Sequence, residues 1–273
     1  MKGGRFFVGG GRMALALGLM LAASGAPAAP MTPKPAKGAP PQGSDAKQKR
    51  CEGAIIRDMK NNSDEITVLG NVLRLSECEL LYSFDTFDPA DWTIVKHTPK
   101  WTVGPDKVVG GGPDEPHHGQ VFYKTPVKGD VVLEFDARII PPSYHDLVWF
   151  WNTRFGVEPW SAGYLGCLGG WFADMAGIEK LPVYKPSAIA PSFPTEPGRT
   201  YHIVSGSIGS EHFIAVDGKL VTYFADEDVP DPSEPGYFGF GIYESHAEYS
   251  HLRVYRPRPR QRPLVYVPGT QRR

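Results

Sequence analysis

The sequence predicts an all-β protein built as a two-sheet antiparallel β-sandwich of the jelly-roll type. Helical periodicity is nearly absent, whereas glycine and proline are frequent, with 31 and 27 of the 273 residues. Short runs of alternating apolar and polar residues recur between turn signals, which is the pattern of half-buried strands. Ten or so strands in roughly 200 residues are typical of two packed sheets.

The expected strands follow one another at short intervals. They are Leu80–Phe84, Gln120–Tyr123, Val131–Ile140, Leu147–Phe155, Gly169–Ala173, Thr200–Ile208, Glu211–Val216, Lys219–Ala225, Tyr237–Glu244 and His251–Arg256. Before them, Ile66–Glu77 is interpreted as a hairpin about Gly70 and Asn71. Between two later strands, Asp217-Gly218 fits a two-residue type I′ turn, which requires positive φ at both residues.

Two of these runs indicate which side chains share a face. In the run 131–140, one face carries Val131, Leu133, Phe135 and Ala137 and the other carries Val132, Glu134, Asp136 and Arg138. In the run 147–155, one face carries Leu147, Trp149, Trp151 and Thr153 and the other carries Val148, Phe150, Asn152 and Arg154. Such alternation is typical of antiparallel sheets with one face in the core and the other toward water or a ligand.

The first 28 residues are interpreted as a signal peptide. Lys2, Arg5 and Arg12 precede an apolar run from Met13 to Ala23, and the small-x-small sequence of residues 26–28 follows as a cleavage site. The apolar run is shorter than the roughly 20 residues of a membrane span. We therefore expect an exported protein, periplasmic or secreted, that does not span a membrane.

The rest of the chain divides into three parts. Residues 29–50 are rich in proline and are expected to form a flexible linker. Residues 51–256 are expected to form one jelly-roll domain, with 51–79 as an attached N-terminal hairpin. Residues 257–273 form a basic Arg/Pro tail, which is either a solvated extension or a contact to an anionic envelope surface.

The domain between the basic ends is acidic. The whole chain has a formal charge of −1, but residues 51–251 carry 14 Lys and Arg against 29 Asp and Glu. Affinity for nucleic acid depends on neutralising phosphates with basic side chains. The charge distribution therefore argues against a nucleic-acid partner.

The three cysteines are consistent with export. Cys51 and Cys78 flank the first segment of the domain and could pair in an oxidising compartment. Cys167 is then left over and is expected to be a buried thiol. The spacing of the three does not match a zinc site.

The last third of the domain contains a recognisable order of strands. "YHIVSGSIG" is followed by "HFIAVDGKLVTYFAD", an acidic loop, "GYFGFGIYES" and "YSHLRVYRP", and the domain begins with "LLYSFDTFDPADWTIV". This order resembles the concanavalin A-like lectin/glucanase superfamily, the laminin-G-like jelly rolls, and looks most similar to its YesU-type bacterial proteins. The resemblance covers residues 79–256. It implies the fold and leaves the activity open, because this fold includes lectins, hydrolases, lyases and adhesion modules.

Candidate catalytic residues follow from that comparison. The retaining endoglucanases of the superfamily carry Glu-x-Asp-x-x-Glu on one strand; here Glu134 and Asp136 match, but Ile139 replaces the last acid. Two carboxylates at i and i+2 lie roughly 6.5–7 Å apart, a spacing that permits glycoside hydrolysis but does not by itself indicate it. His117, beside His118 in a Gly/Pro-rich loop, and His145 are candidate bases, and the adjacent histidines could instead be metal ligands. The alternative is a solvated face and a solvated loop.

Candidate ligand-binding residues form a dense set of aromatic and polar side chains. Sugar rings present apolar faces and hydroxyl groups, which protein sites meet with flat aromatic rings and hydrogen-bonding groups. The set comprises Trp149, Trp151, Asn152, Arg154, Trp160, Tyr164, Trp171 and Asp174. Trp149 and Trp151 share a face, so they are either a ligand platform or part of the core. Glycines 163, 166, 169 and 170 suit a groove wall that carries Tyr164 and Trp171.

The resemblance also raises a calcium site, because many jelly rolls of this superfamily hold one Ca²⁺ with oxygen ligands. The candidates are Asp85, Asp88 and the acids of the loop 226–231, among them Asp226 and Asp228. No compact loop motif selects among them.

The sequence thus predicts an exported jelly-roll protein that binds an oligo- or polysaccharide of the bacterial environment. One alternative is a glycoside hydrolase or polysaccharide lyase acting on such a glycan. The other is a structural domain that contacts the cell envelope.

Overall fold

A computed structural model describes residues 65–68, 70–95, 100–112, 118–144, 146–154, 162–170, 175–182 and 185–261. This part of the chain contains no α-helix, only the 3₁₀ turns η1 (Leu75–Glu77), η2 (Phe84–Thr86) and η3 (Pro89–Asp91), and strands make up most of the rest. None of its helices is long and apolar enough to cross a membrane. The predicted all-β class is confirmed. The proposed signal peptide and linker lie outside the described residues.

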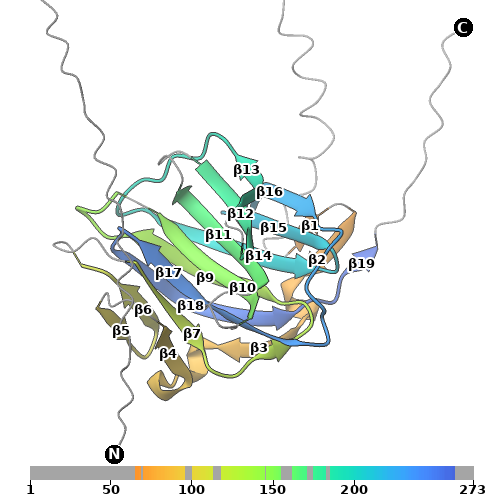
Figure 1. Cartoon of the computed structure of the whole chain (residues 1–273), viewed down its shortest axis with the longest axis horizontal. Coiled ribbons are helices and arrows are strands. Elements are labelled where there is room, and N and C mark those ends of the chain that lie inside the picture. The colour runs from red at the N-terminus through yellow and green to blue at the C-terminus, as the bar shows by residue number, and fades with distance from the viewer. Residues whose placement is uncertain are drawn as a thin grey trace, which may run out of the picture. The chain divides into compact units, whose positions relative to one another are not determined.

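Most strands belong to two large antiparallel sheets that pack face to face (Figure 1). Sheet I has the order β13-β12-β11-β10-β17-β7-β4, with β8 paired to β17; sheet II has the order β16-β15-β14-β9-β18-β6-β5, with β3 paired to β18. The bounds in sheet I are β4 Trp92–Val95, β7 His118–Tyr123, β8 Val127–Lys128, β10 Leu147–Arg154, β11 Ala162–Gly170, β12 Met175–Leu181, β13 Lys185–Ala190 and β17 Pro235–Tyr243. The bounds in sheet II are β3 Glu79–Ser83, β5 Trp101–Val103, β6 Lys107–Gly110, β9 Val132–Ile139, β14 Thr200–Ile208, β15 Glu211–Val216, β16 Lys219–Ala225 and β18 Ala247–Arg256. The predicted two-sheet antiparallel sandwich is confirmed.

The main core lies between the two sheets. Strand β9 of sheet II contributes Leu133 and Phe135, and strand β10 of sheet I contributes Trp149 and Trp151. The two tryptophans are fully buried, at 0% exposure. The alternation predicted for both strands is therefore confirmed, and of the two alternatives for Trp149 and Trp151, the core is correct.

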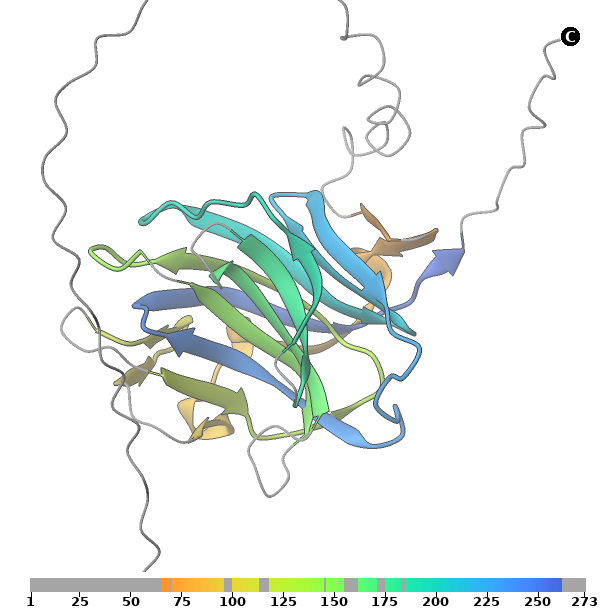
Figure 2. The same ribbon diagram turned by 45° about the horizontal axis from the view of Figure 1, so that its top comes forward.

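A third, small sheet packs on the outer face of sheet II (Figure 2). It consists of β1 (Glu65–Val68), β2 (Asn71–Arg74) and β19 (Arg260–Gln261). Ile66 and Leu73 pack with Val204 and Phe213 of sheet II, which buries the end of that face. The predicted hairpin is present, with its turn just before Asn71 because Val68 pairs with Asn71. Strand β19 lies in the basic Arg/Pro segment 257–273, which was expected to be a tail.

The predicted Asp-Gly hairpin is also present. Val216 pairs with Lys219, and Asp217 and Gly218 have φ values of +50° and +73°. Both residues thus adopt the positive φ that a type I′ turn requires. The strand expected at 169–173 begins earlier than predicted. Strand β11 spans Ala162–Gly170, so the glycines of this segment lie within the strand.

Candidate functional site

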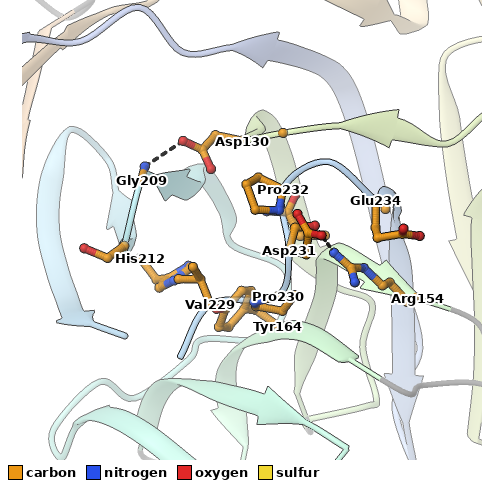
Figure 3. Close-up of a pocket in the computed structure, with 14 residues that line it drawn as sticks. Asp130, Arg154, Tyr164, Gly209, His212, Val229, Pro230, Asp231, Pro232 and Glu234 are labelled. Carbon is orange, nitrogen blue, oxygen red and sulfur yellow. Dashed lines mark hydrogen bonds between the residues drawn. The ribbon is translucent and has the colours of Figure 1, made fainter. Parts of the chain in front are cut away.

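A pocket of about 330 Å³ lies at one end of the sandwich, where several strand ends and connections meet (Figure 3). It is lined by the β8–β9 connection, the end of β10, the β14–β15 turn, the β16–β17 connection and the inward side chains of β11 and β15. The lining residues are Gly129, Asp130, Asn152, Arg154, Tyr164, Gly209, Ser210, His212, Val229, Pro230, Asp231, Pro232, Glu234 and Gly236.

A bulge at the end of β10 gives one wall of the pocket its form. The register of β10 shifts against both neighbouring strands between Phe150 and Arg154. Asn152, inside the shift, has a φ of +50°, a conformation that asparagine tolerates better than most residues. Bulges turn side chains away from the regular alternation. Arg154 beyond the bulge donates a hydrogen bond to the backbone carbonyl of Asp231 in the β16–β17 connection (Figure 3).

A second wall is held by a buried carboxylate that links the two sheets. The Tyr164 hydroxyl donates to Asp226 Oδ2 at 2.8 Å, and Lys180 Nζ lies 2.9 Å from the same oxygen. Burial raises the pKa of Asp226, but hydrogen bonds from Lys180, the Asp228 amide and Tyr164 outweigh it and lower this pKa overall. Burial, and then the Asp226 carboxylate, raise the pKa of Tyr164 well above its usual value. Asp226 is thus charged and Tyr164 neutral at ordinary pH.

His212 lies against Tyr164 in the same wall. The ring centroids are 3.8 Å apart, and His212 Nδ1 is 2.8 Å from Ser207 Oγ. Ser207 Oγ also accepts a hydrogen bond from Trp151 Nε1 at 2.9 Å. Burial lowers the pKa of His212 to about 3, so the ring is neutral at ordinary pH.

The lining of the pocket is acidic. Asp130, Asp231 and Glu234 supply three carboxylates, and Arg154 supplies one cation. Asp130 Oδ2 accepts a 2.6 Å hydrogen bond from the Gly209 amide (Figure 3). Burial raises the pKa of Asp130, and that hydrogen bond only partly offsets it. An anionic ligand would meet electrostatic repulsion here.

The pocket brings together three of the residues predicted to bind a ligand, Asn152, Arg154 and Tyr164. Trp149 and Trp151 do not line it, and the prediction that they form a ligand platform is wrong, because both side chains fill the core between the sheets. The predicted residues His117, His145, Trp160, Trp171 and Asp174 lie outside the described part of the chain.

The predicted catalytic carboxylates lie elsewhere, on the outer face of sheet II. His202 bridges them: its Nε2 is 3.4 Å from Glu134 Oε1 and its Nδ1 is 2.9 Å from Asp136 Oδ1. The other oxygens are also engaged, Glu134 Oε2 by the Tyr255 hydroxyl at 2.8 Å and Asp136 Oδ2 by His251 Nδ1 at 3.0 Å. The hydrogen bond from His202 is the main reason that the pKa of Glu134 is lowered. A general acid needs a raised pKa, so this arrangement does not suit Glu134 as the acid of an acid/base pair.

The calcium candidates are engaged in other contacts. Lys180 Nζ lies between Asp226 and Asp228, 2.9 and 3.5 Å from their carboxylates, where its ammonium charge would oppose a cation. Asp88 accepts a hydrogen bond from the Ala90 amide, and Asp85 is 3.5 Å from Arg253. Within the described ranges no three His, Cys, Asp or Glu side chains are grouped to hold a metal. The ammonium group of Lys180 therefore argues against a calcium ion at Asp226 and Asp228.

The structure describes two of the three cysteines, Cys78 and Cys167. Cys78 Sγ donates to the Arg74 carbonyl at 3.2 Å, and Cys51 lies outside the described residues, so their pairing stays a prediction. Cys167 is buried as expected, at 2% exposure. Burial is the main reason that the pKa of its thiol is raised, which keeps it protonated.

His212, Asp130 and His202 were not predicted from the sequence. For His212 a signal exists, because it alternates with Ile214 and Val216, which face the core. A histidine on the apolar face of a strand is a buried polar group that must find partners. Asp130 gives no such signal, since its partner Gly209 is 79 residues away.

No known family model matches the chain, and no curated protein matches it. Among solved structures, it is similar to a Bacillus subtilis protein of unknown function with a galectin-like fold; the two are 10% identical over 66% of this chain and 96% of that one, with a TM-score of 0.53. The carbohydrate-binding module CBM66 from Bacillus subtilis is 16% identical over 61% of this chain and 96% of that one, with a TM-score of 0.48. The Ca²⁺/Man3GlcNAc-bound exoplasmic/lumenal domain of VIP36 is 10% identical over 61% of this chain and 85% of that one, also with a TM-score of 0.48. The chain has a galectin-like jelly-roll fold, in agreement with the resemblance to the concanavalin A-like superfamily.

Proposed function

We propose that this protein is an exported carbohydrate-binding protein of the YesU type, and that it holds a small neutral sugar in the pocket at the end of the sandwich. The main support for this proposal is that one pocket is lined by polar side chains from distant parts of the chain. They are Asp130, Asn152, Arg154, Tyr164 and His212. These side chains supply hydrogen-bond donors and acceptors, which suit the hydroxyl groups of a sugar.

The size of the pocket limits the ligand. Its volume of about 330 Å³ is near the lower end of the roughly 300–1,000 Å³ typical of small-molecule sites. A monosaccharide, a disaccharide or the terminal unit of a longer chain fits this volume better than an extended oligosaccharide. We therefore propose recognition of short glycans or of chain ends.

The charge of the pocket limits the ligand further. Three carboxylates and one guanidinium line it, and residues 51–251 carry an excess of acids. Uronic acids and sulfated sugars would be repelled, whereas neutral hexoses would not.

A panel of neutral and anionic glycans, followed by calorimetry on each hit, tests the proposal. We expect neutral mono- or disaccharides among the hits, and binding at least tenfold weaker in R154Q, which loses the hydrogen bond to the Asp231 carbonyl. R199Q is the matched control, because Arg199 pairs with Asp217 in the β15–β16 hairpin and does not line the pocket. Its affinity should equal that of the wild type.

Three results would contradict the proposal. Absence of binding to any neutral sugar would favour the structural envelope domain. Equal affinity in R154Q and the wild type would place the sugar elsewhere. Release of reducing ends or unsaturated products from a bound glycan would make the protein a hydrolase or lyase.

Export is part of the proposal and has a separate test. Expression of the full chain in a bacterial host should yield a periplasmic protein whose mass corresponds to cleavage after residue 28, as the small-x-small sequence indicates. Recovery of the uncleaved chain from the cytoplasm would contradict it.

A further inference from the structure

Three buried side chains form a chain of hydrogen bonds that ends at the pocket. Trp151 Nε1 lies 2.9 Å from Ser207 Oγ, and Ser207 Oγ lies 2.8 Å from His212 Nδ1. Ser207 and His212 are cross-strand partners on β14 and β15, and both side chains point between the sheets. All three residues are at most 1% exposed.

The chemistry of the three groups fixes where the protons lie. An indole nitrogen only donates, so Ser207 Oγ accepts from Trp151. The single hydroxyl proton of Ser207 then goes to His212 Nδ1, which accepts it. The reverse arrangement, with Nδ1–H donating to Ser207, would leave a buried hydroxyl proton without an acceptor, which native proteins rarely tolerate. The neutral ring therefore carries its proton on Nε2.

The Nε2–H group is a buried donor with no acceptor among the described residues. Nδ1 is turned to Ser207 inside the sandwich, and His212 lines the pocket beside Tyr164 and Val229 (Figure 3). Nε2, on the opposite side of the ring from Nδ1, is the nitrogen left to meet a molecule in the pocket. A ligand oxygen at hydrogen-bond distance would satisfy it.

We infer that His212 is a specificity-determining residue that donates its Nε2–H to an uncharged oxygen of the ligand, a hydroxyl, ring or carbonyl oxygen, with Ser207 and Trp151 as positioning residues that fix its tautomer. The inference rests on the proposed function and deepens it, because it names the group that selects neutral sugars. A ring that carries no charge gives a carboxylate no ionic attraction to offset the three acids around it.

The burial of His212 excludes a role for its ring as a general base or acid. A base at neutral pH needs a pKa near 7, and burial holds the pKa of His212 at about 3 in spite of Asp226, whose charge is offset by Lys180. His212 is a fixed donor over the whole physiological range.

The test is a long-range ¹H–¹⁵N spectrum of the histidine rings of the full chain at pH 7. The probes are the methyl glycosides of glucose, galactose and mannose, and sodium glucuronate. We expect the Nε2–H tautomer at His212 and a shift of its Nε2–H resonance with at least one neutral glycoside and none with glucuronate. S207A should mix the tautomers and weaken binding several-fold.

Two variants of His212 separate the donor from the ring. H212Q keeps a donor near the position of Nε2 and should retain affinity within about threefold, whereas H212F keeps the ring against Tyr164 and should lose tenfold or more. If either variant fails to fold, the wild-type spectrum still decides. An Nδ1–H tautomer or a cationic ring at pH 7 would overturn the inference, as would an unmoved Nε2–H resonance with a glycoside that calorimetry shows to bind. Failure of every neutral glycoside to bind by calorimetry would instead overturn the proposed function.

Discussion

The hydroxyl of Tyr164 on β11 donates a 2.8 Å hydrogen bond to Asp226 at the end of β16, and so joins the two large sheets beside the pocket. The Asp226 carboxylate is charged and buried, at 8% exposure, and it forms an ion pair with Lys180. The Tyr164 ring also stacks on Trp151 and lies against the tilted ring of His212. The pair thus connects the core, the pocket wall and the acidic connection that precedes β17.

Removal of that hydroxyl should destabilise the fold. A hydrogen bond to a charged group contributes about 2 kcal/mol, and Y164F leaves the ring packing in place. We expect the free energy of unfolding in urea to fall by that amount. Y223F is the control, because Tyr223 is 43% exposed on β16. Equal stability of the two variants would show that the Tyr164–Asp226 bond contributes nothing.

The His202 bridge between Glu134 and Asp136 should make stability depend on pH. The hydrogen bond to Glu134 is the main reason that the pKa of His202 is raised to about 9, from the 6.5 of an unperturbed histidine. Because the folded-state pKa is the higher one, the stabilisation is complete below pH 6.5 and is lost as the pH rises through 9. The side chain is 46% exposed, so solvent limits the effect to about 1 kcal/mol.

Melting temperatures of the wild type and H202Q between pH 6 and 10 measure this effect. The wild type should lose its advantage over H202Q toward pH 10, and added salt should reduce the difference at pH 6. A constant difference between the two proteins across this range would contradict the assignment.

A glycine of β11 should tolerate no side chain. A Cβ at Gly166 would lie 2.3 Å from Trp149 Cε2, in the middle of the core. The rigid indole ring is fully buried and has no room to move, so G166A should cost about 3 kcal/mol, the upper part of the range for overpacking. G112A is the control, because nothing lies within 4 Å of a Cβ there. Urea unfolding of both variants measures the contrast, and a stable G166A would mean that Trp149 packs differently.

The packing role of Gly166 could not be predicted from the sequence, whereas the faces of β9 and β10 could. Alternation predicted the faces of β9 and β10, because the period of a strand is local information. In the sequence alone, the glycines of β11 suggest an irregular groove wall. In the structure, Gly166 lacks a side chain where the ring of Trp149 packs against the strand. Strand β13 is not among the expected strands; it contains Pro186, which a strand tolerates at the edge of a sheet, where β13 lies in sheet I.

The candidate site could be predicted only in part for the same reason. Asn152, Arg154 and Tyr164 were found because polar and aromatic residues cluster locally in the sequence. Their partners come from distant connections: Asp226 is 62 residues from Tyr164, and Asp231 is 77 residues from Arg154. Such pairs are set by the order of strands in the two sheets, which no local pattern contains.

A ¹H–¹⁵N amide spectrum of the full chain, titrated with maltose, cellobiose and lactose, tests directly whether the pocket binds a neutral sugar. We expect at least one of these neutral disaccharides to shift the amides of Gly129, Gly209 and Gly236, which line the pocket from the β8–β9 connection, the β14–β15 turn and the start of β17. The amides of His202 and Arg253, on the outer face of sheet II, should stay unmoved. Shifts confined to that face, or to Gly177 on β12 of sheet I, would contradict binding in the pocket at the end of the sandwich.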